Sequence, residues 1–318
     1  MSRCFVGFDT SNYTTSCALC SEAGEVLANI RIPLPVRDGE RGLRQSDAVF
    51  LHTRQLPNVC RTLRETIGNR EVVAVGYSGR PRPKEDSYMP CFLAGRAAAE
   101  AFAAGLGIPV YEFSHQEGHI MAAGYSAGMT PIMQSKKFGA FHVSGGTTEV
   151  LSVQPDQTGF DIAIVGGTLD LHAGQAIDRI GVMMGLSFPC GKEMERLAAT
   201  NRSPVPKPLV KVAGTNCHLS GLENLAQKLW KESGNSALVS AFVLEYLAKV
   251  LEDMTKGLDQ TEPGLPILYA GGVMSNRFLQ TRLATRPDSY FADPAFSADN
   301  AAGIALLCRD AWYRERNE

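Results

Sequence analysis

Short apolar runs bounded by polar turn residues predict strands at the start of the chain. Residues 4–8 are mostly apolar and lead into the polar sequence Asp9-Thr10-Ser11. Residues 14–19 and 25–32 then carry the pattern of a second and a third strand. This order predicts a meander in which a polar turn joins the first two strands.

The same pattern returns near the middle of the chain. Residues 138–143 form an apolar run that ends in the turn Ser144-Gly145-Gly146-Thr147-Thr148, and residues 149–153 continue as a strand. A polar turn between two strands therefore occurs twice. The repeat predicts two lobes that begin alike.

Longer segments with helical spacing alternate with the strands. Helices are predicted at residues 48–67, 91–104, 178–184, 192–199 and 236–258. A buried strand is predicted at 72–77, and the proline-rich stretch 204–208 predicts a surface loop. Strands that alternate with helices indicate an α/β core.

Composition favours an ordinary globular protein. The chain has 318 residues, of which 44% are hydrophobic and 20% are charged, so it can bury the cores of two lobes. The formal net charge of −2 gives no electrostatic sign of a stand-alone nucleic-acid-binding protein. Contact with RNA would therefore need a local basic patch or a partner.

Neither a membrane segment nor a disulfide framework is indicated. No apolar run approaches the ~20 residues of a membrane span, so no membrane partner is expected and the cytoplasm is the expected compartment. Eight scattered cysteines suit a reducing compartment. Cys17 and Cys20 stand three apart in a predicted strand, which sends their side chains to opposite faces. They are predicted to be core thiols.

A pair of histidines indicates a metal site. His115 and His119 stand four apart after the apolar run 108–111, and on a helix this spacing places both rings on one face. The helical zinc motif of proteases places Glu directly after the first His, whereas this chain has Gln116 there and Glu117 one residue later. A protease is therefore disfavoured, and a third ligand is expected elsewhere.

Glycine-rich turns indicate phosphate binding. The turn 144–148 offers successive backbone N–H groups without Cβ obstruction, which suits phosphate oxygens. The segment 267–277 runs through Gly271-Gly272 into a predicted helix that begins at Ser275 or Asn276. Together with Asp9-Thr10-Ser11, these turns predict a nucleotide cleft between two lobes.

With these motifs, the chain resembles the TsaD threonylcarbamoyladenosine synthases, formerly called O-sialoglycoprotein endopeptidases. The family's segments H-x-E-G-H, S-G-G-x-T, D-x-x-x-G-x-x-x-D, P-x-G, S-G-L, A-G-G-V-x-x-N and D-N are matched by residues 115–119, 144–148, 170–178, 189–191, 220–222, 270–276 and 299–300. The resemblance spans nearly the whole chain. It implies a two-lobed actin/hexokinase/Hsp70-like ATPase fold.

The resemblance also implies ligands. A divalent metal, iron or zinc, would be held by His115, His119 and Asp299. An adenine nucleotide, either ATP or an adenylate, would be held by Ser144, Gly145, Gly146, Asp178, Gly191 and Asn276. The expected lobes are residues 1–110 with 300–318, and residues 111–299, which carry both the metal and the nucleotide motifs.

Three departures from the family pattern bear on the substrate. The family's first turn, E-T-S-C-D-E-T, carries an acidic pair that is missing from residues 9–15. The histidine of S-G-G-H-T is replaced by Thr147, and the family's G-P-G loop by residues 79–86. The candidate catalytic residues are Ser11, Thr147, Arg80 and Arg82. Either arginine could hold an anionic group of the acceptor, the alternative being a solvated charge cluster.

The resemblance implies a carbamoyltransferase that works through an enzyme-bound carbamoyl adenylate. The acceptor is either adenosine of a transfer RNA or, in a diverged paralogue, another small amine or hydroxyl. The departures favour the paralogue, which would not replace an authentic TsaD. A nucleotide-binding scaffold and a sugar or acetate kinase are the alternatives, and a protein partner or a homodimer stays open. The histidine pair argues against both alternatives, because neither needs it.

Overall fold

The chain folds into two compact units. In the computed structural model, residues 2–11, 13–35, 43–84, 86–297 and 300–317 are described. The first unit contains Met1–Ser126, Gln154–Asp161 and Ala295–Glu318, and the second contains Ala127–Val153 and Ile162–Pro294. The predicted boundary after residue 110 therefore differs from the observed division. The segment that carries His115 and His119 belongs to the first unit, because its helix packs on a helix from the C-terminus.

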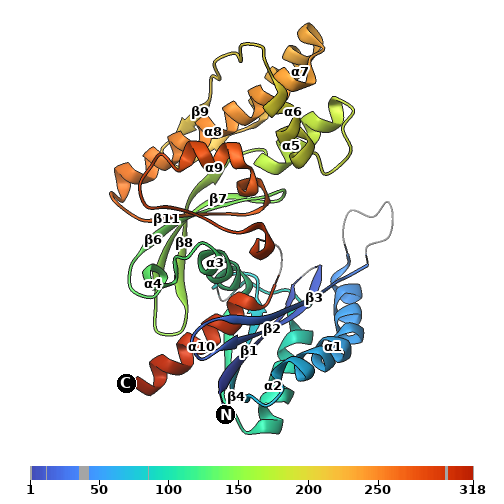
Figure 1. Ribbon diagram of the computed structural model, residues 1–318, viewed down its shortest axis with the longest axis vertical. Coiled ribbons are helices and arrows are strands. Elements are labelled where there is room, and N and C mark those ends of the chain that lie inside the picture. The colour runs from blue at the N-terminus through green and yellow to red at the C-terminus, as the bar shows by residue number, and fades with distance from the viewer. Residues whose placement is uncertain (1, 12, 36–42, 85, 298–299, 318) are drawn as a thin grey trace. The chain divides into compact units, whose positions relative to one another are not determined.

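The first unit is built on a five-stranded sheet with the strand order β3-β2-β1-β4-β5 (Figure 1). Its strands are β1 (Arg3–Ser11), β2 (Thr14–Ser21), β3 (Val26–Pro33), β4 (Glu71–Arg80) and β5 (Val110–Ser114). Its helices are α1 (Gln45–Ile67), α2 (Phe92–Leu106), α3 (His115–Ser126) and α10 (Ala302–Asn317). The meander β1-β2-β3 is antiparallel, and β1, β4 and β5 are parallel.

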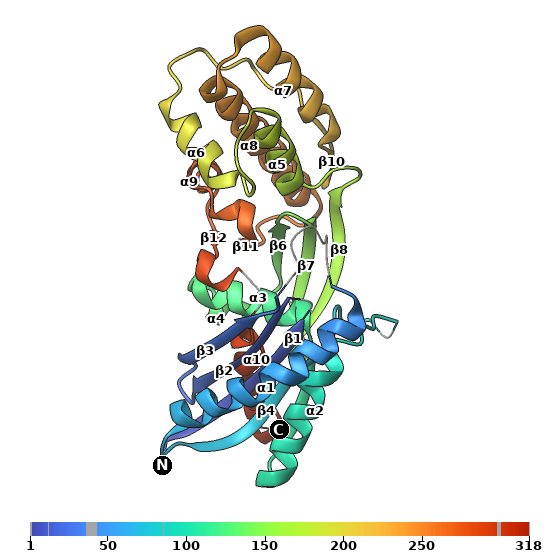
Figure 2. The same ribbon diagram turned by 90° about the vertical axis from the view of Figure 1, so that its right-hand side faces the viewer.

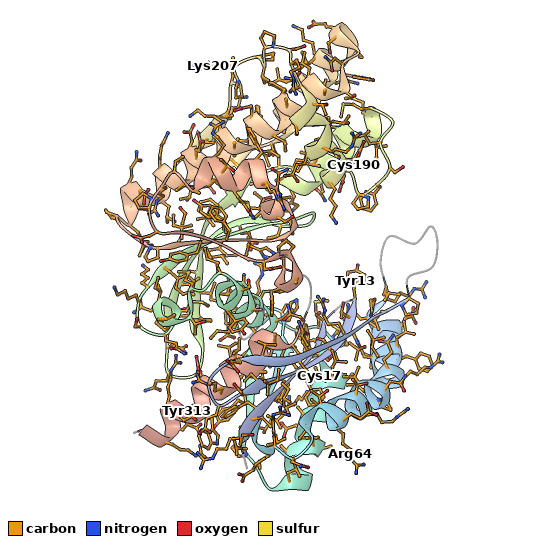
Figure 3. All side chains as sticks on the ribbon, viewed as in Figure 1. Tyr13, Cys17, Arg64, Cys190, Lys207 and Tyr313 are labelled. Carbon is orange, nitrogen blue, oxygen red and sulfur yellow. The ribbon has the colours of Figure 1, made fainter. Side chains whose placement is uncertain are left out.

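Helices cover both faces of this sheet. The thiol of Cys17 points to the carbonyl of Val59 in α1, whereas the thiol of Cys20 points to the carbonyl of Ala305 in α10. Both thiols are fully buried, and burial raises the pKa of each. The prediction of two core thiols on opposite faces is therefore confirmed. Figure 3 shows Cys17 inside this layer.

The second unit is built on a seven-stranded sheet with the order β12-β11-β6-β7-β8-β10-β9 (Figure 2). Its strands are β6 (Phe138–Val143), β7 (Thr148–Pro155), β8 (Phe160–Thr168), β9 (Lys211–Ala213), β10 (Asn216–His218), β11 (Ile267–Ala270) and β12 (Ser289–Phe291). Its α-helices are α4 (Thr130–Met133), α5 (Ala173–Met183), α6 (Gly191–Thr200), α7 (Ser220–Ser233), α8 (Ser236–Thr261) and α9 (Arg277–Leu283). Two short 3-10 helices, η1 (Gly272–Ser275) and η2 (Pro294–Phe296), complete the elements.

Both sheets repeat one topology. In the second sheet, β8-β7-β6-β11-β12 follows the same order as β3-β2-β1-β4-β5 in the first. The turn after β6 therefore corresponds to the turn after β1. This repeat is the architecture predicted for an actin-like ATPase fold.

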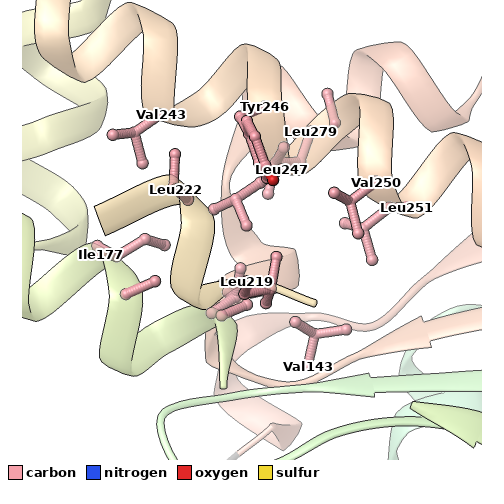
Figure 4. Close-up of a cluster of buried hydrophobic side chains, with 14 of the residues drawn as sticks. Val143, Ile177, Leu219, Leu222, Val243, Tyr246, Leu247, Val250, Leu251 and Leu279 are labelled. Atoms are coloured by element: carbon pink, nitrogen blue, oxygen red, sulfur yellow. The ribbon is translucent and has the colours of Figure 1, made fainter. Parts of the chain in front are cut away.

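One apolar cluster joins the helices of the second unit to its sheet. Val143 at the end of β6, Ile177 in α5 and Leu247 in α8 belong to it, as do Leu222 in α7 and Leu279 in α9 (Figure 4). All five are at most 6% exposed. Burial of a side chain of this kind stabilises the fold by about 1.5–3 kcal/mol. The helices that carry the nucleotide motifs are thus fixed to one core.

Several elements differ from their predicted extent. Helix α5 begins at Ala173, five residues before the predicted start, because the Thr148 hydroxyl accepts a hydrogen bond from the Ala173 N–H. Helices α7 and α10 and the β9-β10 pair were not predicted. Among the described residues, no helix is both long and apolar enough to cross a membrane.

Candidate functional site

A capping box fixes the start of the helix that carries the histidine pair. The hydroxyl of Ser114 accepts a hydrogen bond from the Glu117 N–H at 3.2 Å, and the Glu117 carboxylate accepts one from the Ser114 N–H at 2.7 Å. These reciprocal bonds satisfy two donors at the N-terminus of α3. His115 is consequently the first residue of α3, and His119 lies one turn later on the same side.

The two histidine rings converge. The Nε2 atoms of His115 and His119 are 2.9 Å apart. The Nδ1 atom of His115 lies 2.7 Å from Oδ2 of Asp9, whose side chain is buried. A carboxylate that accepts the Nδ1–H of a histidine leaves its Nε2 lone pair for a metal and fixes the orientation of the ring. The pair therefore fits two ligands of one metal ion.

Asp9 is itself held in place. Its Oδ1 accepts hydrogen bonds from the Ser11 N–H at 2.8 Å and from the Ser78 hydroxyl at 2.9 Å. This carboxylate was assigned to a phosphate-type turn from the sequence, whereas in the structure it orients His115. Sequence spacing could not show this, because the two residues are 106 positions apart.

The proposed third metal ligand, Asp299, lies outside the described residues. The next residue, Asn300, is buried, and its side-chain oxygen caps α10 by accepting the Ala302 N–H at 3.0 Å. A Cβ atom on Gly118 would lie 2.8 Å from the Ile304 side chain of α10. The glycine of H-x-E-G-H thus lets α10 pack closely on α3. Within the described ranges, no group of three His, Cys, Asp or Glu that could hold a metal is found.

Glu117 is unsuited to act as a general base. Its second oxygen accepts the Phe160 N–H at 3.2 Å, and the residue is buried. Burial raises the pKa of this carboxyl, and the hydrogen bonds from Ser114 and Phe160 oppose that effect. Both oxygens are engaged in holding the backbone.

The first turn places a serine next to the Asp9 network. Thr10 is structural, because its hydroxyl donates to the Cys91 carbonyl and accepts the Gly95 N–H, both at 2.9 Å. Ser11 is buried, and within the described part of the chain its hydroxyl has no hydrogen-bond partner. Asn12 lies outside the described residues. Ser11 is thus the residue of this turn whose side chain is not used by the fold.

A buried histidine beside this turn was not singled out from the sequence. His52 in α1 is fully buried, and its Nδ1 lies 2.8 Å from the Thr15 hydroxyl. Burial lowers the pKa of His52, while the Ser11 backbone and the Asp9 charge raise it less strongly. The signal was available, because positions 48, 52, 56, 59 and 63 of α1 form its buried face. A histidine on that stripe was overlooked.

The arginine loop after β4 is partly engaged with its own unit. The Nε of Arg80 lies 3.8 Å from a carboxylate oxygen of Glu112 in β5. The backbone N–H of Arg82 donates to the Ser87 hydroxyl at 3.0 Å, and the Gln116 N–H donates to the Pro81 carbonyl at 3.0 Å. The last bond ties the loop to the first turn of α3. The loop therefore stands beside the histidine pair, as its sequence position did not reveal.

In the second unit, the turn after β6 has an open surface. The Ser144 N–H donates to the Thr147 carbonyl at 2.8 Å, and the Ser144 carbonyl accepts the Gly174 N–H of α5 at 3.1 Å. Gly145 and Gly146 are exposed, and a Cβ atom on either would meet nothing within 4 Å. Packing therefore does not require these glycines. Open space above backbone N–H groups at a helix N-terminus suits a phosphate.

Asp178 fixes the turn that precedes Gly191. Its Oδ1 accepts the Cys190 N–H at 2.8 Å, which fixes the turn that leads into α6. Gly191 begins α6, and a Cβ atom there would again meet nothing within 4 Å. No hydrogen bond from the described residues reaches Oδ2 of Asp178. This oxygen suits a ribose hydroxyl.

Asn276 caps a helix. Its side-chain oxygen accepts the Leu279 N–H at 3.1 Å, so α9 begins where the sequence predicted. The Arg277 N–H donates to Glu195 of α6 at 2.7 Å, which joins the starts of α9 and α6. Gly271 has φ +100°, and a Cβ atom there would clash with the Val143 carbonyl at 2.3 Å. The structure thus brings the predicted nucleotide residues onto one connected set of turns in the second unit.

Asp170 has a structural role that the sequence did not indicate. It accepts the Leu219 N–H at 2.7 Å and the Ser220 hydroxyl at 2.6 Å, and so caps α7. Burial alone would raise the pKa of Asp170, but the hydrogen bonds from Ser220, Leu219 and Leu171 hold it well below its usual range. The D-x-x-x-G-x-x-x-D and S-G-L segments therefore meet through this cap.

Comparison with known proteins decides the family. The model of the family TsaD, tRNA N6-adenosine threonylcarbamoyltransferase, matches residues 88–306. This chain belongs to the TsaD family. A tRNA N6-adenosine threonylcarbamoyltransferase of Streptococcus gordonii is 30% identical over 98% of this chain and 94% of its own length. One from Streptococcus pneumoniae shows the same identity and coverage. The chain is thus a member of a transferase family.

Solved structures support the fold. Full-length HypF in its phosphate- and nucleotide-bound form aligns with a TM-score of 0.58 at 11% identity, over 100% of this chain and 56% of that one. The activator of 2-hydroxyisocaproyl-CoA dehydratase from Clostridium difficile, with bound ADPNP, aligns with a TM-score of 0.51 at 13% identity, over 100% and 98%. At this identity, the likeness concerns the fold alone. The predicted actin-like ATPase fold is confirmed.

Proposed function

We propose that this TsaD-family chain transfers a threonylcarbamoyl group from an adenylate to the N6 amine of an adenosine in transfer RNA. The observation that carries the proposal is the histidine pair, whose Nε2 atoms are 2.9 Å apart while Asp9 holds Nδ1 of His115. Histidines that only filled space in the core would not need a carboxylate to orient the imidazole ring. The curated relatives, named as threonylcarbamoyltransferases over 98% of the chain, support the same reaction.

The metal would be held by His115 and His119, with Asp299 as the expected third ligand. An iron or zinc ion there would supply Lewis-acid chemistry. Neighbouring residues of the chain hold the histidine pair in position. Asp9 fixes the ring of His115, and the capping box of Ser114 and Glu117 fixes the start of α3.

The nucleotide part of the adenylate would be held in the second unit. Backbone N–H groups at Gly145 and Gly146 would donate to phosphate oxygens, Oδ2 of Asp178 would accept from a ribose hydroxyl, and Gly191 would leave room for the ligand. Asn276 contributes by capping α9 beside this surface. Thr147 stands where the S-G-G-H-T pattern of the resemblance has histidine, and its hydroxyl would supply a polar contact there.

Transfer of the threonylcarbamoyl group needs neither an oxidant nor a reductant. The adenosine amine attacks the carbamoyl carbon, and the bond from this carbon to the phosphate oxygen breaks. AMP leaves with the electron pair of the broken bond on its phosphate oxygen, and the attacking amine gives one proton to solvent water. Ser11, whose hydroxyl is not used by the fold, and Arg80 and Arg82, whose loop is tied to α3, would position the acceptor.

Native mass spectrometry of the purified protein tests this proposal. We expect one iron or zinc and, after incubation with threonylcarbamoyl adenylate, one nucleotide per chain. Both should be present in the same complex. Wild-type protein that takes up the nucleotide but never carries metal, or full metal occupancy in His115→Ala/His119→Ala, would contradict the proposed chemistry.

A second candidate is transfer to a different small acceptor. It is favoured by the first turn, which lacks the acidic pair and exposes the ring of Tyr13 (Figure 3). In that case the chain would bind the adenylate as above but leave the transfer RNA unmodified. Complementation of a TsaD-depleted cell separates the two candidates.

A further inference from the structure

Exposed cations follow one another along the segment that begins at α6, next to the candidate nucleotide turn, and ends in β9. No Asp or Glu occurs between Glu195 and Glu223, although the chain as a whole has a formal net charge of −2. Four cations whose side chains are exposed lie on α6, on the loop that follows it and at the first residue of β9: Lys192, Arg202, Lys207 and Lys211. We call these four residues the basic track. Figure 3 shows Lys207 on the loop between α6 and β9.

The charges of the basic track are not neutralised within the fold. Among the described residues, none of the four cations forms an ion pair with a carboxylate. Arg196, on the same stretch, is different, because its guanidinium pairs with Glu193 at 2.6 Å. Arg202 donates only to backbone carbonyls, at Asn201 and Ala199. The track therefore presents positive charge outward.

The loop that carries the track is held in an extended form. Pro204, Pro206 and Pro208 restrict the backbone to extended conformations. Val205 and Val210 pack on the core of the second unit, while Leu209 between the two lysines is 80% exposed. The two valines anchor this segment on the core, whereas the side chains of Lys207 and Lys211 are exposed to solvent. At about 3.1 Å per residue, the two lysines stand about 12 Å apart along the loop.

Helix α6 sets the distance from the nucleotide turn to the track. It begins at Gly191, beside the candidate nucleotide residues, and its ten residues end at Thr200. At 1.5 Å per residue, α6 is about 15 Å long. A ligand bound at Gly191 that is no larger than an adenylate would not extend beyond this length, whereas a folded polyanion can.

We infer that the basic track binds the phosphate backbone of the transfer RNA whose adenosine is the acceptor. This inference rests on the proposed function and adds to it the surface that selects a macromolecular acceptor over a small one. Exposed lysines and arginines without carboxylate partners bind phosphates by releasing counterions, without reading sequence. The exposed side chain of Leu209 adds an apolar contact between two cations.

Binding of an unmodified transfer RNA transcript, measured by fluorescence anisotropy across a salt series, tests the inference. In the triple variant Arg202→Glu/Lys207→Glu/Lys211→Glu we expect the slope of log Kd against log salt to fall by about 2–3, since each phosphate contact contributes about 0.7–0.9. Affinity at low salt should fall at least tenfold. The variant Lys207→Arg/Lys211→Arg keeps the charge and should bind like the wild type.

The matched control is Lys228→Glu/Lys231→Glu/Lys256→Glu, which changes charge equally at exposed positions on α7 and α8. It should change affinity less than threefold. Equal weakening by both triple variants, no weakening by the track variant, or no binding by the wild type would overturn the inference. The thermal shift caused by threonylcarbamoyl adenylate is measured in parallel. If that shift is intact while the triple track variant binds RNA normally, the inference about the basic track is wrong, whereas the proposed adenylate binding is not contradicted.

Discussion

At the residue scale, the proposed chemistry depends on two side chains that are far apart in sequence. Asp9 lies near the end of β1 and His115 begins α3, and their hydrogen bond of 2.7 Å aims Nε2 of His115 at Nε2 of His119. Loss of either partner should therefore act through the metal rather than through the fold. Two predictions separate these effects.

Replacement of His115 by Ala should remove the metal, because one of two facing imidazoles is lost. Asp9→Asn should have a milder effect and weaken metal affinity about 10–100-fold, as expected for a residue that only orients a ligand. Metal per chain is measured by elemental analysis after dialysis. Full occupancy in His115→Ala would show that the histidine pair is not the site.

His52 should make the protein less stable in mild acid. Burial lowers its pKa below the ordinary value of about 6.5, so the unfolded chain binds a proton more readily than the folded one. Stability should therefore be constant above about pH 6.5 and fall as the pH is lowered toward the folded pKa.

Urea unfolding between pH 7.5 and 5 measures this dependence. In His52→Gln the slope over this range should decrease, because the titrating group is gone. Thr15→Val removes the hydrogen bond to Nδ1 but keeps the imidazole, so the dependence should persist. An unchanged slope in His52→Gln would assign the acid sensitivity to another group.

Caps and glycines position the functional segments at the element scale. Asp170 caps α7 through the Leu219 N–H and the Ser220 hydroxyl. Asp170→Ala should therefore destabilise the second unit by about 1–2 kcal/mol, the usual effect of losing a helix cap. Since its folded pKa is lowered, this stabilisation is present above about pH 4 and is lost as the pH falls further.

Denaturant unfolding of Asp170→Ala at pH 7 and pH 3 measures the effect. The difference from the wild type should be full at pH 7 and smaller at pH 3. Ser233→Ala, at the other end of α7, is the control and should change stability by less than about 0.5 kcal/mol. Equal differences at both pH values would show that the charge of Asp170 has no part in the cap.

The elements also show what sequence patterns can predict. The alternation of residues 14–19 correctly placed Cys17 and Cys20 on opposite faces, because strand side chains alternate regardless of distant contacts. The i,i+4 spacing placed His115 and His119 together for the same local reason. The early start of α5 and the cap of α7 depend on Thr148 and Asp170, which lie far away in sequence. The spacing of residues within one element gives no sign of such distant hydrogen bonds.

The whole molecule repeats one sheet topology, and the two copies carry different parts of the chemistry. The end of β1 holds Asp9 and Ser11 near the histidine pair, while the turn after β6 holds the open glycines 145 and 146. The repeat was predicted from two apolar runs with polar turns. The division of the chain was predicted less well, since α3 belongs to the first unit.

The proposed nucleotide residues lie in the second unit, so nucleotide binding should be separable from metal binding. Gly146→Val places a branched side chain in the open space above the turn, and Asp178→Ala removes the ribose acceptor together with the bond to Cys190. Each should weaken ATP binding by about 1–3 kcal/mol in calorimetry while the metal content stays unchanged. ATP affinity unaffected by Gly146→Val would exclude this turn as the phosphate site.

Transfer of the labelled group to RNA is the most direct test of the account. Purified protein is loaded with iron or zinc and incubated with threonylcarbamoyl adenylate, labelled in the carbamoyl carbon, and an unmodified transfer RNA. The digested nucleosides are then separated by mass spectrometry. We expect labelled N6-threonylcarbamoyladenosine from the wild type, at least 100-fold less from His115→Ala/His119→Ala, and normal amounts from Lys228→Glu. Label that stays out of the RNA while the wild type consumes the adenylate, or equal product from the double histidine variant, would contradict the account.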